Sequence, residues 1–268
     1  MLNHGRGLIN NCVTYSTLGR NGRLCNSIFQ ALGTAAYALD NKKSFIFPAW
    51  EYRKYFFQEL PEGNPEIDIK IPVEFHYAPI PVHPDKNIDL HSGQMQSYRY
   101  FFHRWLNLEP YFTLKDMYHY YIWQKYGNHL AMNTCGIHVR RSDYLSPATL
   151  DYHGIMPISY YEEGANRLYG TCKPTDVLFI ICSDDIAWCK NNFSFPNQIF
   201  IEGEKDIIDL YVLMYCKKLI IANSSFSLFP AVVKTIKNNN CGIVAPKKWF
   251  NNASVRTEDI YMPNWIII

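Results

Sequence analysis

The sequence predicts an α/β protein whose second half forms a doubly wound parallel sheet. From Thr134 onward, short apolar runs alternate with helical stretches, and the runs read CGIHV, DVLFIIC, NQIFIEG, KLIIANS and CGIVAP. Strands and helices that alternate at this spacing form right-handed βαβ units, which build a parallel sheet. The length of 268 residues leaves room for two domains. We place the boundary near Met132, giving an N-terminal α/β domain of residues 1–132 and a C-terminal Rossmann-like domain of residues 133–268.

The first half begins with one clear βαβ unit. A strand is predicted at residues 12–17, a helix at 27–40 and a second strand at 44–49. Residues from about 50 to 95 are rich in Pro, His and Asp, which predicts loops and short strands whose individual bounds the pattern does not resolve. Two aromatic-rich stretches, 93–108 and 113–130, are predicted to be helical.

The helices of the second half carry recognisable start signals and apolar faces. They are predicted at residues 159–169, after Ser183 at 184–192, at 205–218, and from 227–230 to about Asn240. The third helix places Ile207, Leu210, Tyr211 and Met214 on one face at i, i+3, i+4, i+7 spacing.

Composition excludes several classes of protein. A hydrophobic content of 48% supports real cores, and a formal net charge of +2 is too balanced for a dedicated nucleic-acid or membrane-surface binder. The eight cysteines form no CxxC pair, which favours buried thiols in a reducing compartment. The N-terminus lacks the apolar core of a signal peptide, and no apolar run approaches the roughly 20 residues of a transmembrane helix. We therefore expect a soluble, cytoplasmic protein with no nucleic-acid partner.

Polar side chains follow several of the predicted strands. Ligands of open α/β sheets collect at the carboxyl ends of strands. These ends carry His138 and Arg140, then Asp184 and Asp185, then Glu202, then Asn223, Ser224 and Ser225. A guanidinium binds phosphate bidentately, so Arg140 predicts an anion site, and His138 shares its face of the strand.

Each of these residues also has a structural interpretation. Arg141 should face the other side of the strand, where it could be surface charge. Asp184 and Asp185 could cap the following helix or accept N–H donors from a guanine base. Ser224 and Ser225 could cap a helix, bind phosphate, or do both. Asp143 could pair with an arginine or accept a proton.

Motifs of metal and cofactor chemistry are missing. No aspartate stands two residues from another, so the DxD signature of metal-bound nucleotide sugars is absent. There is no GxxxxGK, GxGxxG or HExxH sequence either. We expect no metal and no cofactor, with leaving-group charge carried by arginine and backbone amides.

Four ordered motifs resemble one family. GIHVRRSDY resembles the HxRRxDY motif of the α-1,2-fucosyltransferase family, glycosyltransferase family 11, and GRLCNSIFQ is similar to its GRLGNQxFQ. FIICSDDIAWCKNNF is similar to its SDDxxWCK segment, and DLYVLMYCKKLIIANSSFSLF to its DLxLMxxCKHxIIANSSFSWW. The resemblance implies a GT-B-like fold of two Rossmann-like domains, with GDP-fucose bound to the C-terminal domain and a glycan acceptor on the N-terminal side.

The resemblance also implies roles for individual residues. Arg140 would hold the diphosphate, His138 and one of Asp184 or Asp185 would contact guanine, and Ser224 and Ser225 would cradle phosphate. The full donor-binding set is His138, Arg141, Asp184, Asp185, Asn223, Ser224, Ser225 and Phe226. Arg23 and Asn26 would face the cleft from the N-terminal domain.

The implied reaction is an inverting, metal-independent transfer of L-fucose to the 2-hydroxyl of a galactose. Asp143 is the first candidate for the catalytic base, grouped with Arg140 as catalytic, and Asp151 is the second. Cys25, Ser27 and the segment 228–230 depart from the family pattern, which leaves two alternatives open. One is a fucosyltransferase with another acceptor or linkage, and the other is a catalytically silent GDP-sugar-binding or glycan-binding protein.

Overall fold

The computed structural model describes residues 11–170 and 176–268. The chain divides into two compact units, Met1–Lys115 and Asp116–Ile268, and each is described by itself. Cys172 and residues 1–10, on which the expectation about a signal peptide rests, lie outside the described residues. The seven cysteines within the described ranges are buried thiols that form no disulfide with one another, which agrees with the expectation of buried thiols. No helix in those ranges combines the length and apolarity needed to cross a bilayer.

The first unit is built on a parallel sheet of four strands in the order β2-β1-β4-β3. Its first elements are β1 (Cys12–Thr14), α1 (Leu24–Asp40) and β2 (Ser44–Phe45). The parallel pairing of β1 with β2 confirms the predicted βαβ unit. The unassigned region contains a 3-10 helix, η1 (Glu51–Tyr55), and the strands β3 (Ile69–Val73) and β4 (Ile88–Ser92).

The predicted helix at residues 93–108 is wrong. The segment forms short turns instead: η2 (Tyr98–Tyr100), η3 (Phe102–Arg104), α2 (Trp105–Leu108) and then η4 (Glu109–Phe112). Phe101 leaves helical geometry with φ −138°, and it is fully buried against Phe29 of α1, with ring centroids 5.9 Å apart. Burial of individual aromatic rings therefore overrides the local helical tendency.

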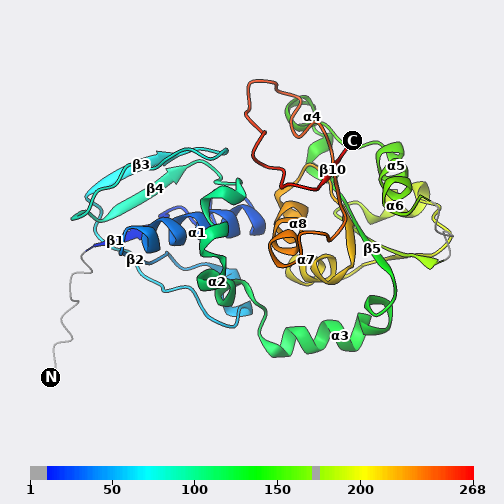
Figure 1. The fold of residues 1–268 in the computed structure, drawn as a ribbon, viewed down its shortest axis with the longest axis horizontal. Helices are drawn as coiled ribbons and strands as arrows, with labels where there is room; N and C mark the ends of the chain where they lie inside the picture. Colours follow the sequence, from blue (N-terminus) through cyan, green and yellow to red (C-terminus); the bar gives the residue numbers. More distant parts are fainter. Residues whose placement is uncertain (1–10, 171–175) are drawn as a thin grey trace. The chain divides into compact units, whose positions relative to one another are not determined.

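The second unit is a parallel sheet of six strands in the order β10-β9-β8-β5-β6-β7. Its strands are β5 (Thr134–Val139), β6 (Leu178–Ser183), β7 (Gln198–Phe200), β8 (Lys218–Ile220), β9 (Ile243–Ala245) and β10 (Ile266–Ile267). Its helices are α3 (Asp116–Leu130), η5 (Ser142–Leu145), α4 (Pro147–His153), α5 (Ile158–Tyr169), α6 (Ile186–Asn192), α7 (Asp206–Tyr215) and α8 (Ser225–Lys237). Helices α5 and α6 cover one face and α7 and α8 the other (Figure 1), so the doubly wound sheet is confirmed.

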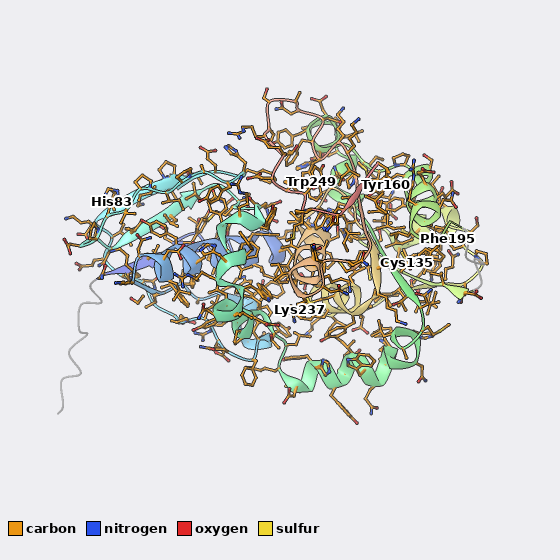
Figure 2. All side chains as sticks on the ribbon, viewed as in Figure 1. His83, Cys135, Tyr160, Phe195, Lys237 and Trp249 are labelled. Carbon is orange, nitrogen blue, oxygen red and sulfur yellow. The ribbon has the colours of Figure 1, made fainter. Side chains whose placement is uncertain are left out.

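The centre of this sheet is tightly packed. All six residues of β5 are buried, and Cys135, labelled in Figure 2, has no exposed surface. A Cβ atom on Gly136 would lie 2.8 Å from the side chain of Leu219 and 3.0 Å from the sulfur of Cys216, so the close approach of β8 and α7 requires glycine here. Tyr160 of α5 donates its hydroxyl to the carbonyl of Ile221 at 2.7 Å, which ties α5 to the end of β8.

Helix α3 belongs to the second unit. Glu204, just before α7, accepts hydrogen bonds from Tyr121 at 2.9 Å and Tyr126 at 2.8 Å and forms an ion pair with Lys125. These bonds hold α3 against the α7 side, so the division between units falls at Lys115 rather than near Met132.

Candidate functional site

Three of the predicted motifs lie side by side at one edge of the six-stranded sheet. Strands β8, β5 and β6 are neighbours, and their carboxyl ends carry Asn223–Phe226, His138–Arg141 and Asp184–Asp185 respectively. Because all three strands are parallel, these ends meet at the same edge. Sheet order thus brings together residues that are far apart in the sequence.

His138 is a neutral, buried hydrogen-bonding group. Its side chain is buried, with 4% of the residue exposed, and its Nδ1 lies 2.9 Å from the Oγ of Ser227 in α8. The ring of Phe226 lies alongside, with centroids 5.0 Å apart. Burial, together with the positive charge of Arg140, lowers the pKa of His138 to about 3. The imidazole is therefore uncharged at neutral pH and can orient a ligand but not attract an anion.

Arg140 is held in place by two carboxylates. Its Nη1 lies 2.7 Å from Oδ2 of Asp184, and its Nη2 pairs with Asp143. The guanidinium also lies 5.1 Å from the centre of the Tyr144 ring, which stacks on His153 with centroids 4.4 Å apart. These contacts fix a cation, 12% exposed, at the edge of the sheet.

Arg141 faces the other side, as the strand alternation predicts. Its Nε lies 3.2 Å from Oδ2 of Asp185, and its guanidinium lies 3.9 Å from the centre of the Trp188 ring. Asp185 also accepts the Trp188 backbone N–H at 3.1 Å, so it is the N-cap of α6. This agrees with the capping interpretation of the two that the sequence left open for Asp185. Asp184 accepts the Arg141 backbone N–H at 2.9 Å in addition to its ion pair. Both aspartates are thus engaged with arginines.

The segment after β8 combines capping with structural anchoring. Ser224 is the N-cap of α8 and accepts the Phe226 backbone N–H at 3.3 Å, which confirms the capping interpretation. Ser225 is the first residue of α8, so the positive end of this helix dipole lies at the same edge. Asn223 is buried, and its Nδ2 donates to the carbonyls of His153 at 2.8 Å and Trp249 at 3.1 Å.

The two candidates for the catalytic base differ in their surroundings. Asp143 is exposed on η5 and paired with Arg140. Asp151 is exposed on α4, one element further along the chain.

The N-terminal candidates lie in the first unit. Arg23 is exposed and precedes α1, and Asn26 donates to Oε1 of Gln94 at 2.8 Å. Cys25 and Ser27, which depart from the family pattern, are buried within this unit. The departures therefore lie among the buried residues of α1.

The sequence-based reasoning missed Asp209. This residue lies on α7, its backbone carbonyl is 4.0 Å from the sulfur of Cys182, and Cys182 is the register partner of His138. Its carboxylate Oδ1 is buried without a hydrogen-bond partner. Burial, with Glu204 and Asp206 nearby, raises the pKa of Asp209 to about 7. The one available signal was a carboxylate inside an otherwise apolar helix, beside the predicted apolar face.

The sequence model described as Glycosyl transferase family 11 matches residues 15–268. The chain belongs to this family. Among family relatives, the O-antigen biosynthesis glycosyltransferase WbnK of Escherichia coli is 37% identical over 50% of this chain and 44% of its own length. An Escherichia coli alpha-1,2-colitosyltransferase is 34% identical over 51% of this chain and 48% of its own length. The human galactoside alpha-(1,2)-fucosyltransferase 1 is 27% identical over 80% of this chain and 64% of its own length.

Each of these matches spans less than two thirds of the relative, and those to the two bacterial proteins span less than half. Among solved structures, this family 11 chain is similar to the alpha-1,6-fucosyltransferase NodZ co-crystallised with GDP, with a TM-score of 0.55 and 12% identity over 82% of this chain and 91% of NodZ. Similarity at this identity concerns the fold, and it confirms the GT-B-like architecture expected from the sequence.

Proposed function

We propose that the protein is a fucosyltransferase that moves L-fucose from GDP-fucose to a hydroxyl of a glycan acceptor. The finer proposal is an inverting, metal-independent transfer to the 2-hydroxyl of a galactose. Family membership supports the glycosyl transfer, and the human relative's description, galactoside alpha-(1,2)-fucosyltransferase 1, supports the linkage.

The observation that carries the proposal is the fixed cation at the end of β5. Arg140 has several N–H donors, of which Nη1 and Nη2 face Asp184 and Asp143. The remaining donors, with the positive end of α8, suit a diphosphate that gains charge as it departs. Asp184 holds the guanidinium of Arg140 in a fixed orientation. Arg140 therefore needs little movement to stabilise the charge that develops during the reaction.

We assign recognition of the guanine base to Asp209, in preference to Asp184 or Asp185, and keep His138 as its partner in this role. The backbone of Asp209 contacts Cys182, which is the register partner of His138. Guanine presents two adjacent N–H donors, and the unpartnered Oδ1 of Asp209 needs donors. Asp184 and Asp185 already accept from arginines and backbone amides. A pKa of about 7 means that the carboxylate becomes fully available once N–H donors stabilise its ionised form.

The reaction is a single displacement. The acceptor hydroxyl attacks the anomeric carbon, the bond from that carbon to the diphosphate breaks, and the hydroxyl proton passes to a base. Asp143 remains the first candidate for this base because it is exposed beside Arg140, and Asp151 remains the second. Arg23 and Asn26 stay candidates for the acceptor side.

The colitosyltransferase relative supports a second candidate function. The same site would then transfer colitose instead of fucose from a GDP-linked donor. The anion site and the guanine contact would be shared, and only the sugar would differ.

Calorimetric titration with GDP, ADP and UDP, followed by an assay of GDP release from GDP-fucose with and without lactose, tests the proposal. Selective GDP binding with lactose-stimulated release, and a product whose NMR spectrum shows an α-1,2 linkage, is the expected result. Selective binding without release under an acceptor and donor screen would indicate a silent binder. Absence of a guanine preference would contradict the assignment of the donor.

A further inference from the structure

We propose that the second unit carries a docking surface for an anionic phospholipid membrane, at the edge of the sheet opposite the anion site. The surface consists of a lysine-lined cavity and the exposed aromatic face of α3. It is independent of the proposed donor chemistry, because the cavity lies where strands begin: Asn133 precedes β5, Lys217 precedes β8 and Cys241 precedes β9.

The cavity is strongly basic. It has a volume of about 560 Å³, and its lining includes the four lysines Lys217, Lys218, Lys234 and Lys237. Among the described residues that line it there is no aspartate or glutamate. Lys237, labelled in Figure 2, lies in the last turn of α8.

The four lysines carry more positive charge than the C-terminal ends of the neighbouring helices can neutralise. Lys234 donates to the carbonyls of Met214 at 3.4 Å and Cys216 at 2.5 Å, so it satisfies the C-terminal end of α7. Lys218 donates to the carbonyl of Leu168 at 2.9 Å and lies 4.1 Å from the centre of the Tyr169 ring, so it satisfies the C-terminal end of α5. The C-terminal ends of α5, α7 and α8 together contribute about −1.5 elementary charges, at about −0.5 for each helix. Four ammonium groups exceed that, which leaves the cavity with a net positive charge that an anion can neutralise.

An exposed apolar face borders the cavity. Helix α3 leaves Met117 66% and Tyr120 64% exposed, and Trp123, one turn after Tyr120, is also exposed. The Trp123 ring contacts Tyr215, which lines the cavity, with centroids 6.0 Å apart. Met132, exposed as well, immediately precedes Asn133 of the cavity. The aromatic face and the lysines therefore form one continuous surface.

A membrane surface is the partner that fits both parts. Tyr and Trp rings lie well at the headgroup level, and long apolar side chains such as Met117 enter the acyl boundary. Lysines beside such a face attract anionic headgroups, and a concave cavity can accept one phosphate. The acidic residues at the start of α7 and just before it, in the segment 204–209, lie at the other end of this helix from Tyr215 and do not line the cavity.

Flotation of the full chain with vesicles tests the proposal. We expect binding to phosphatidylcholine vesicles that contain phosphatidylglycerol, little binding to pure phosphatidylcholine, and release in high salt. Each lysine near an anionic surface raises the vesicle partition coefficient about fivefold. Lys217→Glu combined with Lys237→Glu should therefore lower the partition coefficient by about 25-fold or more. The matched control, Lys247→Glu with Lys248→Glu, changes the charge equally on the exposed loop after β9 and should retain most binding.

A second measurement does not depend on charge reversal. Vesicles with brominated acyl chains should quench tryptophan fluorescence of the unaltered protein, and Trp123→Phe should remove much of that quenching while circular dichroism and thermal unfolding stay unchanged. Equal binding to neutral vesicles, equal losses in both lysine pairs, or quenching that survives Trp123→Phe would overturn the proposal. The proposal would also be overturned if the protein bound no vesicle but bound the acidic glycan heparin through the same lysines.

Discussion

Replacement of Arg140 by alanine separates the chemical role of this residue from its structural role. In the proposed reaction the variant loses the cation that stabilises the departing diphosphate, and loss of one such electrostatic group costs about 10²–10³ in turnover, or about 3–4 kcal/mol. The structural cost is smaller. Asp184 is left without its ion-pair partner, but its side chain is 21% exposed and keeps the Arg141 backbone N–H at 2.9 Å. We expect about 1–2 kcal/mol of lost stability, below the 3–5 kcal/mol typical of a broken buried pair.

Two assays run on the same preparation test this separation. Release of GDP from GDP-fucose in the presence of lactose reports turnover, and urea unfolding reports the free energy of unfolding. Arg167→Ala is the matched control, because Arg167 forms an exposed pair with Glu163 four residues away. Such a pair contributes at most about 0.5 kcal/mol to the free energy of unfolding, and its loss should leave turnover unchanged. A folded Arg140→Ala protein with near-normal turnover would refute the assignment of Arg140.

Further outcomes are expected for Asp209, for Ser224 and for metal removal. Asp209→Asn should abolish the preference for GDP over ADP in calorimetry, and GDP affinity of the unaltered protein should fall as pH drops below about 7, because the carboxyl then takes up a proton. The folded protein holds this proton between the unfolded pKa of about 3.9 and the folded pKa of about 7, so this group makes stability fall as pH rises through that window. Asp209→Asn should therefore raise the unfolding midpoint at pH 8, and an unchanged midpoint would argue against a carboxylate whose Oδ1 is buried without a partner. Ser224→Ala should cost about 1 kcal/mol in urea unfolding, since the Phe226 N–H loses its cap, and should weaken GDP binding only modestly. EDTA should leave GDP release unchanged, whereas a strict requirement for Mn²⁺ or Mg²⁺ would show that the metal-free mechanism is wrong.

Much of the candidate site follows from local pattern. Alternation along GIHVRR places His138 and Arg140 on one side of β5 and Arg141 on the other, and the contacts with Ser227, Asp184 and Asp185 agree with this. The capping role of Ser224 also follows from its position between a strand and a helix. Such features depend on residues close in sequence, where the periods of strands and helices determine direction.

Other features depend on burial, which local pattern does not report. The segment 93–108 has a helical composition, yet Phe101 packs against Phe29 and the chain breaks into short turns. The short strands expected between residues 50 and 95 could not be placed, because the proline and polar residues of β3 and β4 weaken the strand pattern, although the two strands pair in a parallel sheet. Asp209 could not be distinguished from an exposed helical carboxylate until α7 was placed against β6.

The sequence by itself determined the parallel α/β class of the second unit, the identity of the residues that end its strands and the family to which the motifs point. Only the tertiary structure decided which carboxylate pairs with which arginine, because that depends on the order β8-β5-β6. It also decided that α3 belongs with the second unit, through the bonds of Glu204 to Tyr121 and Tyr126. The physical reason is the same in each case: direction along an element is local, whereas burial and pairing arise between segments far apart in the chain.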